Sequence, residues 1–77
     1  MIVEKLRVIV QPYLQGEVEI GLDSHLVNDL ALDSIDIVDV MISLEDAFNL
    51  RIKDKELDGF KIVRDIVHFI EMKLNAQ

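Results

Sequence analysis

The sequence predicts an all-α domain of three main helices and one short helical turn. Apolar residues recur at the three- and four-residue spacing of an amphipathic helix in three segments, residues 2–10, 34–49 and 62–74. Residues 18–22 alternate apolar and polar side chains as a strand does, but no second alternating run exists to pair with them. A long connection, residues 15–32, separates the first two helices. Because the chain has only 77 residues, we expect a single domain spanning residues 1–77.

The composition restricts the chemistry and the partners. The chain contains no cysteine, so disulfides and thiolate chemistry of its own are excluded. Charges interrupt every apolar run, so no membrane span is expected, and without a recognisable signal sequence the expected location is cytoplasmic. The net charge is −7, and residues 8–50 carry nine acids but no Lys or Arg. This charge favours basic protein surfaces as partners over nucleic acid, unless the acids serve solubility alone.

The first helix is expected to begin near Ile2 and to turn Leu6 toward the core. Pro12 limits its length, because proline lacks a backbone N–H and disfavours helical geometry in the residue before it. The helix therefore ends near Val10 or continues as a kinked last turn to Leu14.

The connection after it is expected to be an extended loop. A loop this long in a small domain is usually functional or held by its own side chains. The side chains expected to hold it against the helices are Val18, Ile20, Leu22, Leu26 and Leu30.

The second helix is expected to run from Ser34 to about Asn49. Asp33 is a good N-cap, because its carboxylate can accept hydrogen bonds from the free backbone N–H groups of the first turn. Ser34 then occupies the first helical position, where its hydroxyl can be reached from outside. The stripe expected to face the core consists of Ile37, Val40, Met41, Leu44, Ala47 and Phe48.

A second apolar stripe, formed by Ile35, Val38 and Ile42, lies roughly opposite the first. Two interpretations stay open. The stripe packs under the long loop or another helix, or it is a docking strip in which apolar contacts give affinity and flanking carboxylates give orientation. The acids that border it are Asp36, Asp39, Glu45 and Asp46.

The rest of the chain is expected to hold one short turn and the last helix. Asp54 is a candidate cap for the turn, which ends at Leu57. The last helix begins at residue 62 or 63, without a good capping side chain, and runs to Leu74. Its expected inner face consists of Val63, Ile66, Val67, Ile70 and Leu74, with aromatic bulk from Phe60 and Phe69.

Catalysis by this chain is not expected. A serine hydrolase needs a base, and only His25 and His68 are available, without a G-x-S-x-G turn. Asp23, His25 and Asp29 lie close in sequence, but no EF-hand pattern surrounds them. We therefore expect no dedicated metal site.

Two Asp-Ser pairs compete as a functional position, one at Ser24 and one at Ser34. Ser24 lies within the loop, where it can cap a short turn. Ser34 opens the long helix, and a phosphate ester there would meet the positive helix end and its free backbone donors. The plainer alternative is that Ser34 only caps the helix.

At these residues the chain resembles the acyl carrier protein family. Asp33-Ser34-Ile35 stands where that family has Asp-Ser-Leu, after Asp29-Leu30 and before an acidic helix. The segment Leu44–Ile52 and the helix from Val63 to Ile70 extend the resemblance over essentially the whole length.

The resemblance implies a four-helix bundle that carries 4'-phosphopantetheine on Ser34. It implies a phosphopantetheinyl transferase that installs this group from coenzyme A with magnesium, and a thiol on which acyl groups are carried as thioesters. Ile66 and Ile70 would help line a cavity for the acyl chain. The chain would act as a monomer and meet synthases and acyltransferases through their basic patches. The implied partner-recognition residues are Asp33, Ile35, Asp36, Val38, Asp39, Ile42, Glu45 and Asp46.

Departures from the family pattern leave the pathway open. Ala31-Leu32 replaces a glycine and a small residue, and Leu32-Asp33-Ser34 is also similar to D-alanyl carrier proteins. The expected pathway is fatty acid biosynthesis or a related lipid or polyketide pathway, with amino-acid cargo as an alternative. Further alternatives are an unmodified acidic protein-interaction domain and a calcium-responsive helical domain.

Overall fold

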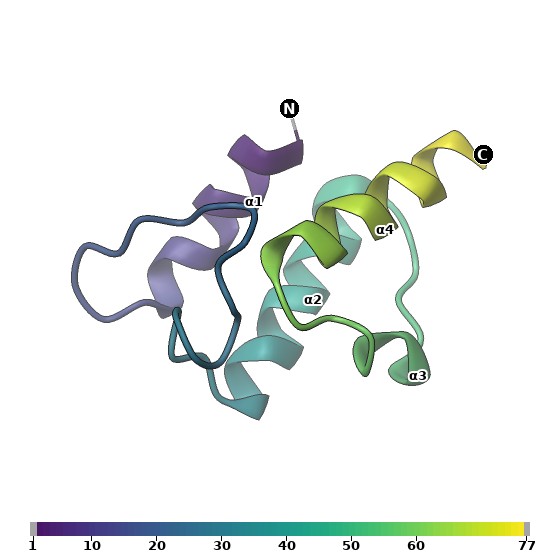
Figure 1. Cartoon of the computed structure of the whole chain (residues 1–77). Helices are drawn as coiled ribbons and strands as arrows, with labels where there is room; N and C mark the ends of the chain where they lie inside the picture. Colours follow the sequence, from purple (N-terminus) through teal and green to yellow (C-terminus); the bar gives the residue numbers. More distant parts are fainter. Residues whose placement is uncertain (1, 77) are drawn as a thin grey trace.

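The computed structural model describes residues 2–76 and confirms an all-α fold with a long loop between the first two helices (Figure 1). Its helices are α1 (Ile2–Val10), α2 (Ser34–Phe48), α3 (Asp54–Leu57) and α4 (Val63–Asn75). Within residues 2–76 the only β-type pairing is an isolated antiparallel bridge between His25 and Ile62. None of the described helices is both long enough and apolar enough to cross a bilayer.

The first helix ends where proline chemistry predicts. α1 stops at Val10 with Leu6 and Val10 buried, and a 3₁₀ turn, η1 (Gln11–Tyr13), follows it directly. Pro12 lies in this turn, which closes with a hydrogen bond from the Leu14 N–H to the Gln11 carbonyl at 3.1 Å. The two expected endings therefore describe one structure, an α-helix to Val10 and a tighter turn beyond it.

The core face of α2 is confirmed except at its edge. Val40, Met41 and Leu44 are buried, and Ile37 and Phe48 pack against the core. The expectation for Ala47 is wrong, because this side chain is exposed. Its methyl group lies in a surface groove of about 320 Å³ between α1 and α2, which is lined by Glu4, Lys5, Val8, Ile9 and Ala47.

The short helix and the last helix differ from expectation at their ends. α3 begins at Asp54 itself, so Asp54 is not the cap; the Lys53 N–H before it donates to the Glu56 carboxylate at 2.8 Å. α4 continues to Asn75, and Leu74 is 37% exposed instead of facing inward. Figure 1 shows the last turn of α4 at the C-terminal end of the chain, and Leu74 is only partly covered there.

The core half of α4 is as expected. Val63, Ile66, Val67 and Ile70 are buried, and Ile66 and Ile70 are among the most completely buried side chains. The rings of Phe60 and Phe69 pack edge to face with centroids 5.2 Å apart.

The long loop is held to the helices by apolar side chains. Ile20, Leu26 and Leu30 are buried as expected, and Val18 is half-buried. The expectation for Leu22 is wrong, because its side chain is 36% exposed and its contact with α4 is made by its backbone carbonyl, which accepts from the Arg64 N–H. The buried residues of the loop complete the side of the core that three helices leave open.

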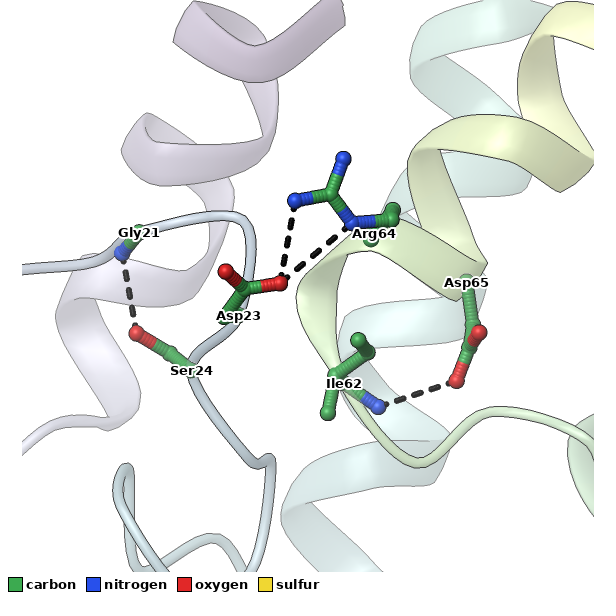
Figure 2. Close-up of polar contacts among 6 residues, drawn as sticks. All are labelled: Gly21, Asp23, Ser24, Ile62, Arg64 and Asp65. Atoms are coloured by element: carbon green, nitrogen blue, oxygen red, sulfur yellow. Dashed lines mark hydrogen bonds and ion pairs between the residues drawn. The ribbon is translucent and has the colours of Figure 1, made fainter.

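Backbone hydrogen bonds also join the loop to the start of α4. The Val63 N–H donates to the Ser24 carbonyl at 3.0 Å, and the Arg64 N–H donates to the Leu22 carbonyl at 2.8 Å. The Arg64 guanidinium reaches the Asp23 carboxylate at 3.0 Å (Figure 2). The loop therefore satisfies the first two free donors of α4 with its own carbonyl groups.

Candidate functional site

Ser34 lies inside a reciprocal capping box at the N-terminus of α2. The Asp36 N–H donates to Asp33 Oδ1 at 2.8 Å, and the Asp33 N–H donates to Asp36 Oδ2 at 3.2 Å. Asp33 is the predicted N-cap. The reverse bond, which the Asp36 carboxylate accepts, is not among the sequence-based expectations, although an acid three residues after a cap is its sequence signal.

The two residues before the capping box, Ala31 and Leu32, have a fixed backbone position. Leu32 is buried, and its N–H donates to the Leu26 carbonyl at 3.0 Å. Ala31, just before it, has a positive φ of 56°, a conformation that costs an alanine free energy and ends the preceding turn. Ser34 is therefore only two residues from a core side chain.

His25 and Asp29 are engaged within the preceding turn. Nδ1 of His25 accepts hydrogen bonds from the next two free backbone N–H groups, of residues 27 and 28, at 3.2 and 3.1 Å. The Asp29 carboxylate accepts from the His25 N–H at 2.7 Å. Asp23, the third acid or histidine of this region, pairs with Arg64 instead. Across residues 2–76, no three His, Asp or Glu side chains are grouped so as to hold a metal ion.

The two serines of the Asp-Ser pairs have different surroundings. Ser24 is half-buried, and its hydroxyl accepts a hydrogen bond from the Gly21 N–H at 2.9 Å (Figure 2). Ser34 is exposed, and within residues 2–76 no hydrogen bond engages its hydroxyl. The third serine, Ser43, is half-buried in the middle of α2. Of the three, Ser34 is the one whose hydroxyl is open to a reagent.

The N-terminus of α2 is also chemically open. The backbone N–H groups of Ser34 and Ile35 have no acceptor among the described residues. Loop carbonyls occupy the corresponding donors of α4, as described above. Free N–H groups and the positive helix end together favour an anion, so a phosphate joined to Ser34 would fit here.

At the start of α4, an acidic side chain also accepts hydrogen bonds from the backbone. The Asp65 carboxylate accepts hydrogen bonds from the backbone N–H groups of Ile62 and Lys61, at 3.0 and 2.9 Å. These two bonds hold the pKa of Asp65 below its ordinary value, with smaller contributions from the charges of His68 and Lys61. An acid in the first helical turn thus replaces the missing cap that made this start hard to locate in the sequence.

The second apolar stripe faces solvent. Ile35, Val38 and Ile42 are 71%, 47% and 51% exposed. The interpretation that this stripe packs under the loop or another helix is therefore wrong. Three large apolar side chains on one side of one helix, next to an exposed serine, form a surface suited to a partner.

The acids around the stripe differ in whether their carboxylates are hydrogen-bonded within the chain. Asp39 and Asp46 are exposed, and no hydrogen bond or ion pair within the described chain engages their carboxylates. The two capping acids, Asp33 and Asp36, are bonded to each other's backbone. Glu45 is half-buried and accepts from the backbone N–H of residue 52 at 2.7 Å. All five contribute negative charge, but only the first two offer a carboxylate free of internal bonds.

Comparison with known proteins identifies the kind of site. The family model described as a phosphopantetheine attachment site matches residues 4–70. The chain is 47% identical over 58 residues to the acyl carrier protein of Coprothermobacter proteolyticus, covering 75% of this chain and 71% of that protein. It is 38% identical over 68 residues to the acyl carrier protein of Clostridium perfringens, covering 87% and 90%.

A solved structure agrees. A candidate acyl carrier protein from Mycobacterium tuberculosis superposes with a TM-score of 0.86 at 25% identity, over 94% of this chain and 97% of that chain. The helices and the long loop described above are therefore the fold of that protein too.

Proposed function

The chain belongs to the acyl carrier protein family, and from that premise we propose that Ser34 is the residue to which 4'-phosphopantetheine is attached. A protein of this family is a carrier and not a catalyst, so Ser34 is a tether. We choose Ser34 because it lies at the open N-terminus of α2, where its exposed hydroxyl is beside two N–H groups without acceptors. Ser24 and Ser43 lack both features.

Attachment needs only an accessible hydroxyl from this chain. The Ser34 oxygen forms a bond to the pantetheine-bearing phosphorus of coenzyme A, and the pyrophosphate P–O bond breaks. Adenosine 3',5'-bisphosphate leaves, and the Ser34 proton passes to a base of the transferase or to water. The N–H groups of Ser34 and Ile35 are placed to donate to the resulting phosphodiester. Once attached, the group supplies the thiol that a chain without cysteine lacks.

The exposed stripe is the docking surface that we propose for partner enzymes. Ile35, Val38 and Ile42 supply apolar contact area, and Asp39 and Asp46 supply charges free to pair with a basic partner. The expected partners are a phosphopantetheinyl transferase, synthases and acyltransferases. Charge of one sign around an apolar strip speeds encounter with a basic partner and fixes the orientation of docking.

The cargo that we propose is an acyl chain of fatty acid, lipid or polyketide biosynthesis. The relatives above are named acyl carrier proteins, which favours acyl cargo over amino-acid cargo. Aminoacylation of the modified protein by D-alanine–activating enzyme, without acceptance of malonyl groups from an acyltransferase, would reverse this choice.

Incubation with coenzyme A, magnesium and a promiscuous phosphopantetheinyl transferase tests the attachment site. Intact mass spectrometry should show one phosphopantetheine per wild-type chain and none on Ser34→Ala. Ser24→Ala is the matched control, and it should be modified to the same extent as the wild type. The absence of any addition to the wild type, or an addition that survives Ser34→Ala, would contradict the proposal.

A further inference from the structure

The carboxylate of Asp36 is hydrogen-bonded to the backbone of Asp33, the residue before Ser34. Its Oδ2 accepts from the Asp33 N–H at 3.2 Å, and its own N–H donates to Asp33 Oδ1 at 2.8 Å. The Asp36 side chain is half-buried, whereas Asp39, three residues later, is exposed and its carboxylate makes no hydrogen bond within the described chain. The two acids therefore have different environments although they lie on the same helix.

The capping box closes a ring around the reactive residue. Asp33 has an extended backbone with φ −92° and ψ 179°, and Ser34 begins the helix directly after it. The peptide that joins them is held by the helix itself, because the Ile37 N–H donates to the Asp33 carbonyl at 3.0 Å. The preceding peptide, between the buried Leu32 and Asp33, is held by the Asp36 carboxylate through the Asp33 N–H. Loss of the Asp36 carboxylate would release the Asp33 N–H and let the Leu32–Asp33 peptide rotate, which would disturb the N-cap residue and shift the Ser34 hydroxyl that follows it.

We propose that Asp36 is a positioning residue for the modification of Ser34, and that Asp39 is the nearby acid that partners recognise by charge. Asp36 acts through Asp33, by holding the hydroxyl and the two open N–H groups in one orientation. Small displacements of a reacting group lower the rate of the bound complex, whereas loss of a recognition charge weakens encounter. The inference rests on the proposed attachment of phosphopantetheine at Ser34.

Steady-state kinetics with a promiscuous phosphopantetheinyl transferase separate the two roles. Release of adenosine 3',5'-bisphosphate is followed at saturating coenzyme A while the concentration of the apo-carrier is varied. Asp36→Ala should lower kcat about 5- to 10-fold with KM changed less than about twofold. Asp36→Asn should recover most of the lost kcat, because an amide oxygen can still accept from the Asp33 N–H. Asp39→Asn, the matched control, should raise KM about 3- to 10-fold.

Amide hydrogen exchange by NMR tests the structural step without an enzyme. The Asp33 amide should exchange faster in Asp36→Ala than in wild type, and at the wild-type rate in Asp39→Asn. A rise in KM for Asp36→Asn equal to that for Asp39→Asn would overturn the inference, as would an unchanged kcat for Asp36→Ala. If wild-type protein gains no phosphopantetheine, the proposed function itself fails. Failure of the variants alone would overturn only the role of Asp36.

Discussion

The carboxylate of Glu45 accepts a hydrogen bond from the backbone N–H of Ile52 at 2.7 Å, across seven residues of sequence. The carbonyl of Glu45 also accepts from the N–H groups of Asn49 and Leu50. Asn49 ends α2 in the left-handed conformation, at φ 52°. Glu45 therefore accepts hydrogen bonds at the C-terminus of α2 and from the segment that leads to α3. Its carboxylate is part of the fold, although the sequence places it among the acids of the docking surface.

Glu45→Ala should destabilise the protein by about 1–3 kcal/mol, because the half-buried Ile52 N–H loses a charged acceptor. Asp46→Ala is the matched control on the next residue, and its exposed side chain should change the free energy of unfolding by less than about 0.5 kcal/mol. Urea denaturation of both variants measures the difference. Equal stabilities for the two variants would contradict the assigned role of Glu45.

Ile42→Ser should weaken docking without unfolding the protein. Since the side chain is 51% exposed, we expect a loss of stability below about 1 kcal/mol. The transferase KM should rise about 5- to 10-fold, as for loss of a central apolar contact. Met72→Ser on α4, which is 61% exposed on another helix, is the control and should leave KM unchanged. A large loss of stability with a normal KM would contradict the role of this stripe as a docking surface.

Acid should weaken the N-terminus of α4 through Asp65. Its pKa is lower in the folded protein than in the unfolded chain, so the carboxylate stabilises the fold fully above the unfolded pKa of about 3.9. This stabilisation is lost as the pH falls through the lower pKa of the folded state. Asp65→Asn should therefore be less stable than wild type at pH 7, by about 0.5–1 kcal/mol, since two bonds to a charged acceptor become bonds to a neutral one.

The difference between Asp65→Asn and wild type should shrink as the pH is lowered below about 4. Urea denaturation at neutral and acid pH measures it. Asp58→Asn is the control, because Asp58 is exposed and its carboxylate makes no hydrogen bond inside the described chain, and it should show no such change. A stability gap for Asp65→Asn that is independent of pH would contradict the assignment.

Local patterns in the sequence are sufficient for much of this structure. Apolar spacing predicts the three long helices, Pro12 predicts the end of α1, and Asp33 predicts the start of α2. The second stripe of α2 is visible in the same periodicity, and so is its border of acids. These features depend on residues within one or two helical turns of each other, and such local patterns can be read from the sequence.

The features that were missed depend on contacts between distant segments. Nothing near Val63 reveals that a carbonyl of the loop will accept its N–H, and nothing near Glu45 reveals its bond to Ile52. Ala47 and Leu74 have apolar side chains at helical spacing, but Ala47 lies in an open surface groove and Leu74 is only partly covered. The sequence also does not say which acids will be engaged by backbone groups, and that distinction separates Asp36 from Asp39.

Peptide mapping locates the serine that carries the modification. Trypsin is unsuitable, because residues 8–50 contain no Lys or Arg and one peptide would hold all three serines. Cleavage before aspartate instead separates them into residues 23–28, 33–35 and 39–45. After treatment with coenzyme A and the transferase, we expect phosphopantetheine on the peptide Asp33–Ile35 alone. Its appearance on the peptide with Ser24 or Ser43, and not on Asp33–Ile35, would contradict attachment at Ser34.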